Sequence, residues 1–133
     1  MIDYPLPKAD AQTAPFWDGC AQGTLKYQRC ESCGTVQFTP RASCMQCHDL
    51  RLAWEESSRY GTILSYTLVH RAPVAAFKAK TPYVIAIVDM DEGFRLMANA
   101  SEAVAKELQI NSRVRIGFTQ VNDVALPIVE ALA

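Results

Sequence analysis

The chain has 133 residues, of which half are apolar and a fifth charged, and its formal net charge is −1 at pH 7. This composition is typical of a folded globular protein of one domain or two small modules and excludes a disordered or fibrous chain. The charge balance offers no general attraction for a polyanion. The segment Met1 to Thr13 lacks the regions of a secretory signal, and the longest apolar run, Tyr83 to Val88, is too short to cross a bilayer. We therefore expect a cytoplasmic protein without membrane contact.

Residues 1–23 predict an arm followed by a short helix. Thr13 is placed to cap the helix, and Pro15 suits its first turn. Phe16 and Cys20 share one face, and Trp17 lies beside them. Because a helix of about two turns is rarely stable alone, it must dock either on this chain or on a partner. Both alternatives are open, and Phe16 and Trp17 are the candidate partner-interface residues.

Four cysteines then form two pairs, each with a two-residue gap and with ten residues between the pairs: Cys30, Cys33, Cys44 and Cys47. In a reducing compartment such pairs are typical of a metal site, because this gap lets both thiolates of a pair face one tetrahedral ion. Four thiolates leave no position for water or substrate. The spacing therefore predicts one structural zinc ion per chain, which stabilises a segment with too few apolar residues for a core of its own.

Rival interpretations of these cysteines are weaker. Cys44 to His48 fits the attachment motif of covalent haem, but this would leave the first pair unexplained. His48 could replace Cys47 as a ligand, although the symmetry of the pairs favours Cys47. An iron–sulfur or redox role is a further alternative. Cys20 has no activating base nearby in the sequence, so a buried thiol is favoured over a nucleophile.

The remainder predicts a small barrel. Strand patterns cover residues 62–70, 83–90, 94–98, 113–119 and 125–129, and Ser101 begins a helix between the third and fourth strands. This order of elements is that of the five-stranded OB-fold. The sequence thus predicts a mainly β protein in three parts: an arm and helix (1–23), a rubredoxin-like zinc ribbon (24–56) and an OB-fold barrel with one helix (57–133).

An OB barrel binds ligands beside the loop between its first two strands, here Arg71 to Pro82. Its candidate ligand-binding residues are Arg71, Phe77, Lys78 and Lys80, since three cations around an aromatic ring can hold phosphates and stack a base. The alternative is a solvated basic loop with Phe77 as a packing anchor. The second binding loop, Val121 to Ala125, has no cation, which disfavours nucleic acid. No catalytic constellation is present in the sequence.

The sequence also resembles a known family, first catalogued as a domain of unknown function: the zinc-ribbon/OB-fold proteins associated with acyl-CoA enzymes. The resemblance runs from about Ala14 to the C-terminus. It rests on residues 15–17, 25–34, 37–41, 61–67, 70–73 and 81–84. One departure is the second cysteine pair, which usually reads Cys-Pro-x-Cys-Gly and here is followed by His48, so that its turn is expected to be less tight.

The resemblance implies a non-catalytic accessory subunit of a thiolase-superfamily enzyme, meaning a thiolase, aldolase or acyltransferase, that helps assemble the enzyme or bind its acyl-CoA substrate. It also implies that some relatives pair with enoyl-CoA hydratases. The alternative function is a single-stranded nucleic-acid-binding module, which a zinc ribbon with an OB barrel would permit. The neutral barrel favours the accessory subunit, and we expect no nucleic-acid partner.

Overall fold

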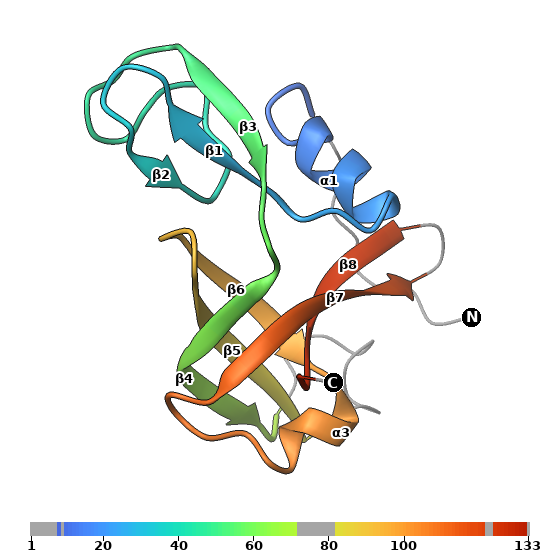
Figure 1. Cartoon of the computed structure of the whole chain (residues 1–133). Helices are drawn as coiled ribbons and strands as arrows, with labels where there is room; N and C mark the ends of the chain where they lie inside the picture. The colour runs from blue at the N-terminus through green and yellow to red at the C-terminus, as the bar shows by residue number, and fades with distance from the viewer. Residues whose placement is uncertain (1–7, 9, 72–81, 122–123, 133) are drawn as a thin grey trace.

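The computed structural model describes residues 8, 10–71, 82–121 and 124–132. Figure 1 shows a three-stranded sheet beyond one end of a closed five-stranded barrel, with a helix beside them. The mainly β architecture predicted from the sequence is thus confirmed. Within the described residues, no helix has the length and apolar character needed to span a membrane.

The first helix, α1 (Ala14–Ala21), occupies the predicted place, but its start differs in detail. Thr13 holds the N-cap position without a side-chain capping bond. The bonds instead involve Asp10, whose carboxylate accepts from the Thr13 N–H at 2.9 Å and whose carbonyl accepts from the Ala14 N–H at 2.8 Å. Phe16 and Cys20 share the buried face, as predicted, with exposed fractions of 3% and 1%.

The small sheet places β1 (Lys26–Cys30) between β2 (Val36–Gln37) and β3 (Leu52–Glu56), with both pairings antiparallel. The first two strands fall where the sequence has short strand-like stretches, at residues 25–29 and 36–38. The third strand was not predicted, because it is only partly buried along its length and shows no alternation of apolar and polar residues. Its pairing with all five residues of β1 nevertheless fixes the place where Cys30 begins the metal site.

The barrel has the strand order β4-β5-β6-β8-β7, which confirms the predicted OB-fold. Its strands are β4 (Tyr60–Val69), β5 (Tyr83–Met90), β6 (Arg95–Ala100), β7 (Arg113–Val121) and β8 (Val124–Glu130). Alternation explains their orientation: Val84, Ala86 and Val88 of β5 are buried, while the residues between them are less so. The barrel closes where β4 pairs with β7 and where β6 runs parallel to β8.

The helix α3 (Glu102–Ala105) lies between β6 and β7 as predicted and has four residues. Ser101 stands at its N-cap position without a side-chain hydrogen bond, while its N–H donates to the Val129 carbonyl at 3.0 Å. Turns follow the helix, and Val104 and Leu108 are each 7% exposed. Burial of these apolar side chains against the barrel, rather than helix length, places this segment.

Aromatic rings connect α1, the small sheet and the barrel. Tyr27 of β1 stacks on Phe94, beside the start of β6, with ring centroids 4.9 Å apart. Phe38 contacts both Phe94 (5.8 Å) and Phe16 of α1 (5.0 Å). The three parts therefore share one hydrophobic core, which holds the base of the small sheet against the barrel.

Candidate metal centre

The four predicted ligands converge at the outer end of the small sheet. The sulfurs of Cys30, Cys33, Cys44 and Cys47 all lie within 4.8 Å of one another. Cys30 Sγ lies 3.5 Å from Cys47 Sγ, and Cys33 Sγ lies 3.6 Å from Cys44 Sγ. A tetrahedral zinc ion with Zn–S bonds of about 2.3 Å needs sulfurs roughly 3.8 Å apart. The four-sulfur set fits such an ion, and its closed coordination would give the ion a structural rather than a catalytic role.

The two cysteine turns have the same backbone geometry. In the first, the Gly34 N–H donates to the Cys30 carbonyl at 3.0 Å, and Gly34 has φ of +77°. In the second, the His48 N–H donates to the Cys44 carbonyl at 3.0 Å, and His48 has φ of +66°. The expectation of a less tight second turn is therefore wrong, because His48 adopts the left-handed conformation that glycine adopts more readily.

The electrostatics of the thiols also suit a cation. Hydrogen bonds from the Thr35 hydroxyl and backbone lower the pKa of Cys33 to about 6. The Asp49 backbone also lowers the pKa of Cys47. The neighbouring sulfurs, Cys30 first, outweigh this effect and raise the pKa of Cys47 to about 12. The pKa values of Cys33 and Cys47 thus shift in opposite directions, and a dication bound to both sulfurs would favour the thiolate form of each.

Two buried glutamines, which the sequence did not single out, hold the segment that leads into the second cysteine pair. Gln28 accepts from the Arg41 N–H at 2.9 Å and donates to the Arg41 carbonyl at 3.0 Å. Gln37 accepts from the Met45 N–H at 2.9 Å and donates to Gln28 Oε1 at 2.8 Å. Both side chains thus make hydrogen bonds to the backbone of this segment that a neighbouring strand would otherwise make. These bonds hold Cys44 against the small sheet.

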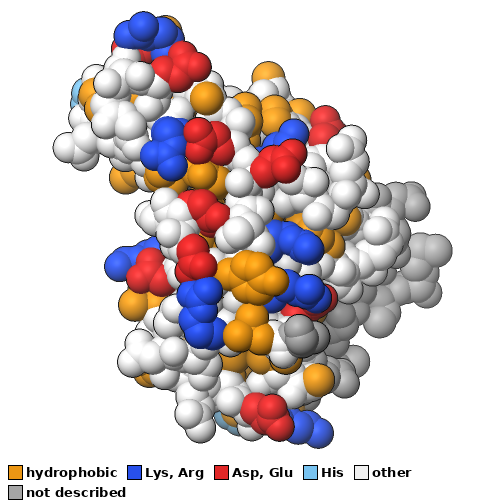
Figure 2. Space-filling view, viewed as in Figure 1, with side chains coloured by type: hydrophobic (Ala, Val, Ile, Leu, Met, Phe, Trp, Pro, Cys, Tyr) orange, Lys and Arg blue, Asp and Glu red, His pale blue; other side chains and the backbone are white. Residues whose placement is uncertain are grey.

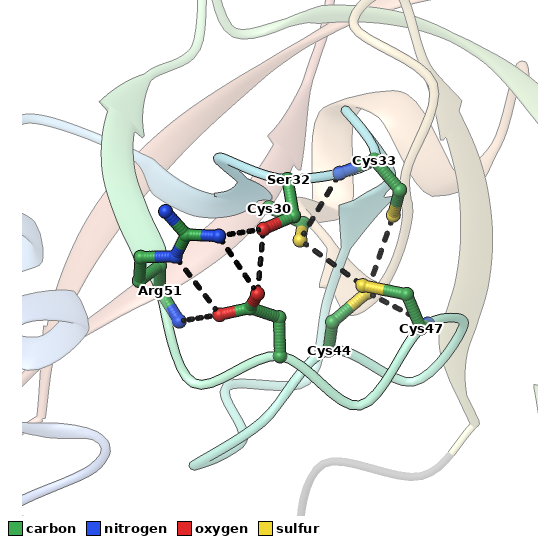
Figure 3. Close-up of polar contacts among 7 residues, drawn as sticks. Cys30, Ser32, Cys33, Cys44, Cys47 and Arg51 are labelled. Carbon is green, nitrogen blue, oxygen red and sulfur yellow. Dashed lines mark hydrogen bonds and ion pairs between the residues drawn. The ribbon is translucent and has the colours of Figure 1, made fainter.

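A second polar group lies beside the cysteines (Figure 3). Ser32, inside the first cysteine pair, donates to the Asp49 carboxylate at 2.6 Å. Arg51 donates to Ser32 Oγ at 2.6 Å and to both Asp49 carboxylate oxygens, at 3.2 and 3.1 Å. These bonds hold the pKa of Asp49 well below its ordinary value, Arg51 being the first cause.

The predicted ligand-binding loop is largely outside the described residues. Arg71 is exposed just beyond the end of β4, whereas Phe77, Lys78 and Lys80 all lie outside the described part of the chain. Their role in binding stays a prediction.

The predicted partner-interface residues differ from each other. Phe16 is 3% exposed and packs within this chain, so its ring is not a surface feature. Trp17 contacts Phe16 edge-on at 4.8 Å between centroids and is only partly buried. Trp17 also lines an open apolar hollow of about 210 Å³ between α1, residues 38–40 just after β2, and the barrel. The hollow's other walls include Phe38, Pro40 and Met97.

The fold and the cysteine cluster together define a class of protein: a zinc ribbon joined to an OB-fold barrel. Comparison with known families agrees with both parts. The model of the ChsH2 rubredoxin-like zinc ribbon domain matches residues 17–53, and the model of the ChsH2 C-terminal OB-fold domain matches residues 54–119. The chain belongs to this ChsH2/DUF35 family.

Relatives carry two kinds of name. A "DUF35 domain-containing scaffold protein" of Methanocaldococcus jannaschii is 33% identical over 97 residues, which cover 71% of this chain and 67% of that protein. A "Probable enoyl-CoA hydratase alpha subunit" of Thermomonospora curvata is 28% identical over 125 residues, which cover 93% of this chain. The matching region is only 39% of that hydratase subunit, so the chain spans well under half of its length.

A solved structure resembles the whole arrangement. A chain of the "Ltp2-ChsH2(DUF35) aldolase" superposes with a TM-score of 0.82 at 27% identity, covering 95% of this chain and 98% of that chain. The similarity therefore extends over helix, ribbon and barrel together.

Proposed function

We propose that this chain is a non-catalytic scaffold subunit that binds a thiolase-superfamily enzyme and helps assemble it or bind its acyl-CoA substrate. The observation that carries the proposal is the superposition over 95% of this chain on a chain of the Ltp2-ChsH2(DUF35) aldolase. The closed four-sulfur site supports a role without catalysis, because such a site has no open position for a reacting group.

We further propose that Cys30, Cys33, Cys44 and Cys47 bind one zinc ion per chain. The zinc ribbon model that matches residues 17–53 and the mutual approach of the four sulfurs within 4.8 Å support this assignment. When bound, zinc would link the two cysteine turns, while the chain's own residues provide all four ligands.

The partner surface we propose includes Trp17 and the apolar hollow beside it. Met97, at the edge of this hollow, is 68% exposed, and large exposed apolar residues beside a concave surface are typical of protein interfaces. An enoyl-CoA hydratase is the second candidate partner, because the relative from Thermomonospora curvata carries that name.

For acyl-CoA we propose contact through Arg71 and, by the sequence pattern, through Phe77, Lys78 and Lys80. Arg71 is exposed just beyond β4, where a phosphate could approach it. Charge reversal at Arg71 and Lys78 should raise the apparent KM of the partner complex for acyl-CoA. An unchanged KM would remove this assignment and leave the scaffold role intact.

The described surface supports the scaffold role over nucleic-acid binding. On the face seen in Figure 2, basic and acidic side chains are interspersed rather than gathered by sign. Three barrel arginines are paired with carboxylates: Arg95 with Asp89, Arg113 with Asp91, and Arg115 with Glu130. A strand of nucleic acid needs unpaired positive charge to displace its counterions.

Co-expression tests the proposal directly. The tagged chain should co-purify with a thiolase-superfamily enzyme encoded beside it, and the enzyme should lose solubility or activity when expressed alone. The chain alone should show no thiolase, aldolase or hydratase activity. Absence of any such complex, or salt-sensitive micromolar binding of single-stranded oligonucleotides at physiological ionic strength, would overturn the proposal.

A further inference from the structure

The polar group formed by Ser32, Asp49 and Arg51 lies beside the four sulfurs and joins residues that adjoin both cysteine turns (Figure 3). Ser32 is one residue from Cys33 of the first turn, and Asp49 is two residues beyond Cys47 of the second. Their side chains meet at 2.6 Å although they are 17 residues apart in the chain. Arg51 completes the group, with its guanidinium 2.6 Å from Ser32 Oγ.

Backbone bonds extend these contacts to the ligands themselves. The Asp49 carbonyl accepts from the N–H of Cys44 at 2.8 Å. The Arg51 carbonyl accepts from the N–H of Glu31, next to Cys30, at 2.9 Å. The Arg51 N–H also donates to Asp49 Oδ1 at 2.8 Å, which fixes the carboxylate relative to the chain that leads into β3. The group therefore joins the backbone of one cysteine turn to that of the other.

We propose that Ser32, Asp49 and Arg51 are positioning residues for the metal: they hold the two cysteine turns at the separation that four-sulfur coordination needs and thereby slow the loss of zinc. This inference rests on the zinc site proposed above but not on the scaffold role. Opening of the site requires the two turns to separate, and separation breaks the Ser32–Asp49 bond, whose two partners Arg51 also contacts. Outer residues of this kind usually change metal affinity by roughly 10–100-fold when they are replaced.

Exposure limits the size of the effect. The Arg51 side chain is 68% exposed, and an exposed ion pair by itself contributes little to stability. Asp49 is less exposed, at 27%, and its carboxylate accepts bonds from both Ser32 and Arg51. We therefore expect the lower end of the range, an increase of about 10-fold in the rate of zinc loss for Asp49→Asn.

The experiment compares zinc release from the full chain into excess EDTA, at fixed pH and ionic strength. Asp49→Asn should release zinc about 10-fold faster than wild type, and Ser32→Ala should do so by a smaller factor. The rate of zinc release from Arg51→Lys should resemble that of Arg51→Gln rather than that of wild type. Lysine keeps the charge but lacks the guanidinium fork that contacts Ser32 and Asp49 together. If Arg51→Lys released zinc at the wild-type rate, the charge of the side chain alone would be acting, and the proposal would be overturned.

A matched control lies on the barrel. Asp91 accepts from Arg113 through both oxygens, at 2.6 and 2.9 Å, and this pair is remote from the cysteines in sequence. Asp91→Asn should leave zinc release unchanged. With Co²⁺ in place of zinc, Asp49→Asn should shift the visible bands that report thiolate geometry, whereas Asp91→Asn should not. Equal release rates for Asp49→Asn and wild type, or equal effects of the two Asp→Asn changes, would contradict the inference. A wild-type chain that binds no zinc would instead contradict the metal assignment.

Discussion

Gln28 and Gln37 are the buried polar side chains among the residues that the structure describes, with exposed fractions of 3% and 2%. They lie opposite each other on β1 and β2, and each bonds to backbone of the segment that precedes or begins the second cysteine turn. A buried amide without a partner costs free energy, so these two side chains are tied to one conformation of the ribbon. Their effect is local and should be separable from metal binding.

Gln37→Leu tests this network. The change leaves the Met45 N–H without its acceptor and removes the donor to Gln28, and we expect it to destabilise the zinc-loaded chain by about 2–3 kcal/mol. Denaturant unfolding followed by tryptophan fluorescence measures the change. Gln109→Leu, at an exposed position, is the control and should alter stability by less than about 0.5 kcal/mol. Equal effects of the two changes would contradict the assigned role.

Cys20 gives a prediction for alkaline pH. Burial raises the pKa of its thiol from 9.0 to about 11, so the folded chain keeps a proton that the unfolded chain releases between these values. Stability should therefore be intact below pH 9 and fall by about 2–3 kcal/mol as the pH rises to 11. Cys20→Ala should be less stable at neutral pH but show a flatter pH dependence over this interval. Parallel curves for the two proteins would exclude Cys20 as the cause.

At the scale of elements, sequence pattern and structure agree where a strand carries a clear apolar pattern of its own. The run of apolar residues in β5 predicted a buried strand from Tyr83 to Met90, and both ends are correct. β3 was missed because its burial depends on pairing with β1 rather than on its own pattern. The contacts of Arg51 with Ser32 were missed for a similar reason: they join residues 19 apart across two turns, a separation that no local pattern reports. The convergence of the four cysteine sulfurs was predictable because the spacing of the cysteines alone encodes this geometry.

The helix α1 shows the same limit. Its sequence predicted the helix and its buried face but left open whether Phe16 docks on this chain or on a partner. The structure places Phe16 against Phe38 within the chain's own core. The predicted divisions of the chain at residues 23 and 56 stay predictions, since a shared aromatic core does not define where one part ends.

Separate substitutions in α1 should now have different effects. Phe16→Ala removes a buried ring and should destabilise the chain by about 3–5 kcal/mol, because the surrounding rings cannot fill the space. Trp17→Ala should leave the fold and metal content intact but weaken co-purification with the partner enzyme, since Trp17 is only partly buried beside the open hollow. Thermal unfolding, zinc content and pull-down yield measure the two outcomes.

Ala21→Ser, on the exposed side of the same helix, is the control and should change none of these quantities. A Trp17→Ala chain that binds the partner as wild type does would move the interface away from α1. A Phe16→Ala chain with unchanged unfolding would contradict its place in the core.

At the scale of the whole molecule, the shared core raises the question of whether ribbon and barrel unfold together. The ribbon meets the barrel through Tyr27 and Phe94, which stack at 4.9 Å, and through Phe38. The barrel has in addition its own closed circuit of strand pairings, which includes no ribbon strand. The ribbon has only a small sheet, and the zinc ion that we propose for it would stabilise it, because the apparent binding free energy of zinc in small zinc domains is about 10–16 kcal/mol.

Removal of zinc should therefore unfold the ribbon and leave the barrel folded. Cys44→Ser, or EDTA added to the wild-type chain, should abolish zinc binding and release amide-exchange protection in β1 and β3, because these strands would lose the four-sulfur link at their end. Protection in β5 and β7 should persist, since their pairings lie within the barrel. Hydrogen exchange read by mass spectrometry resolves the two regions, and Ser43→Ala, which leaves all four sulfurs in place, is the control. Loss of protection in all four strands at one rate would show that the aromatic core makes ribbon and barrel a single cooperative unit, and the metal would then stabilise the entire chain.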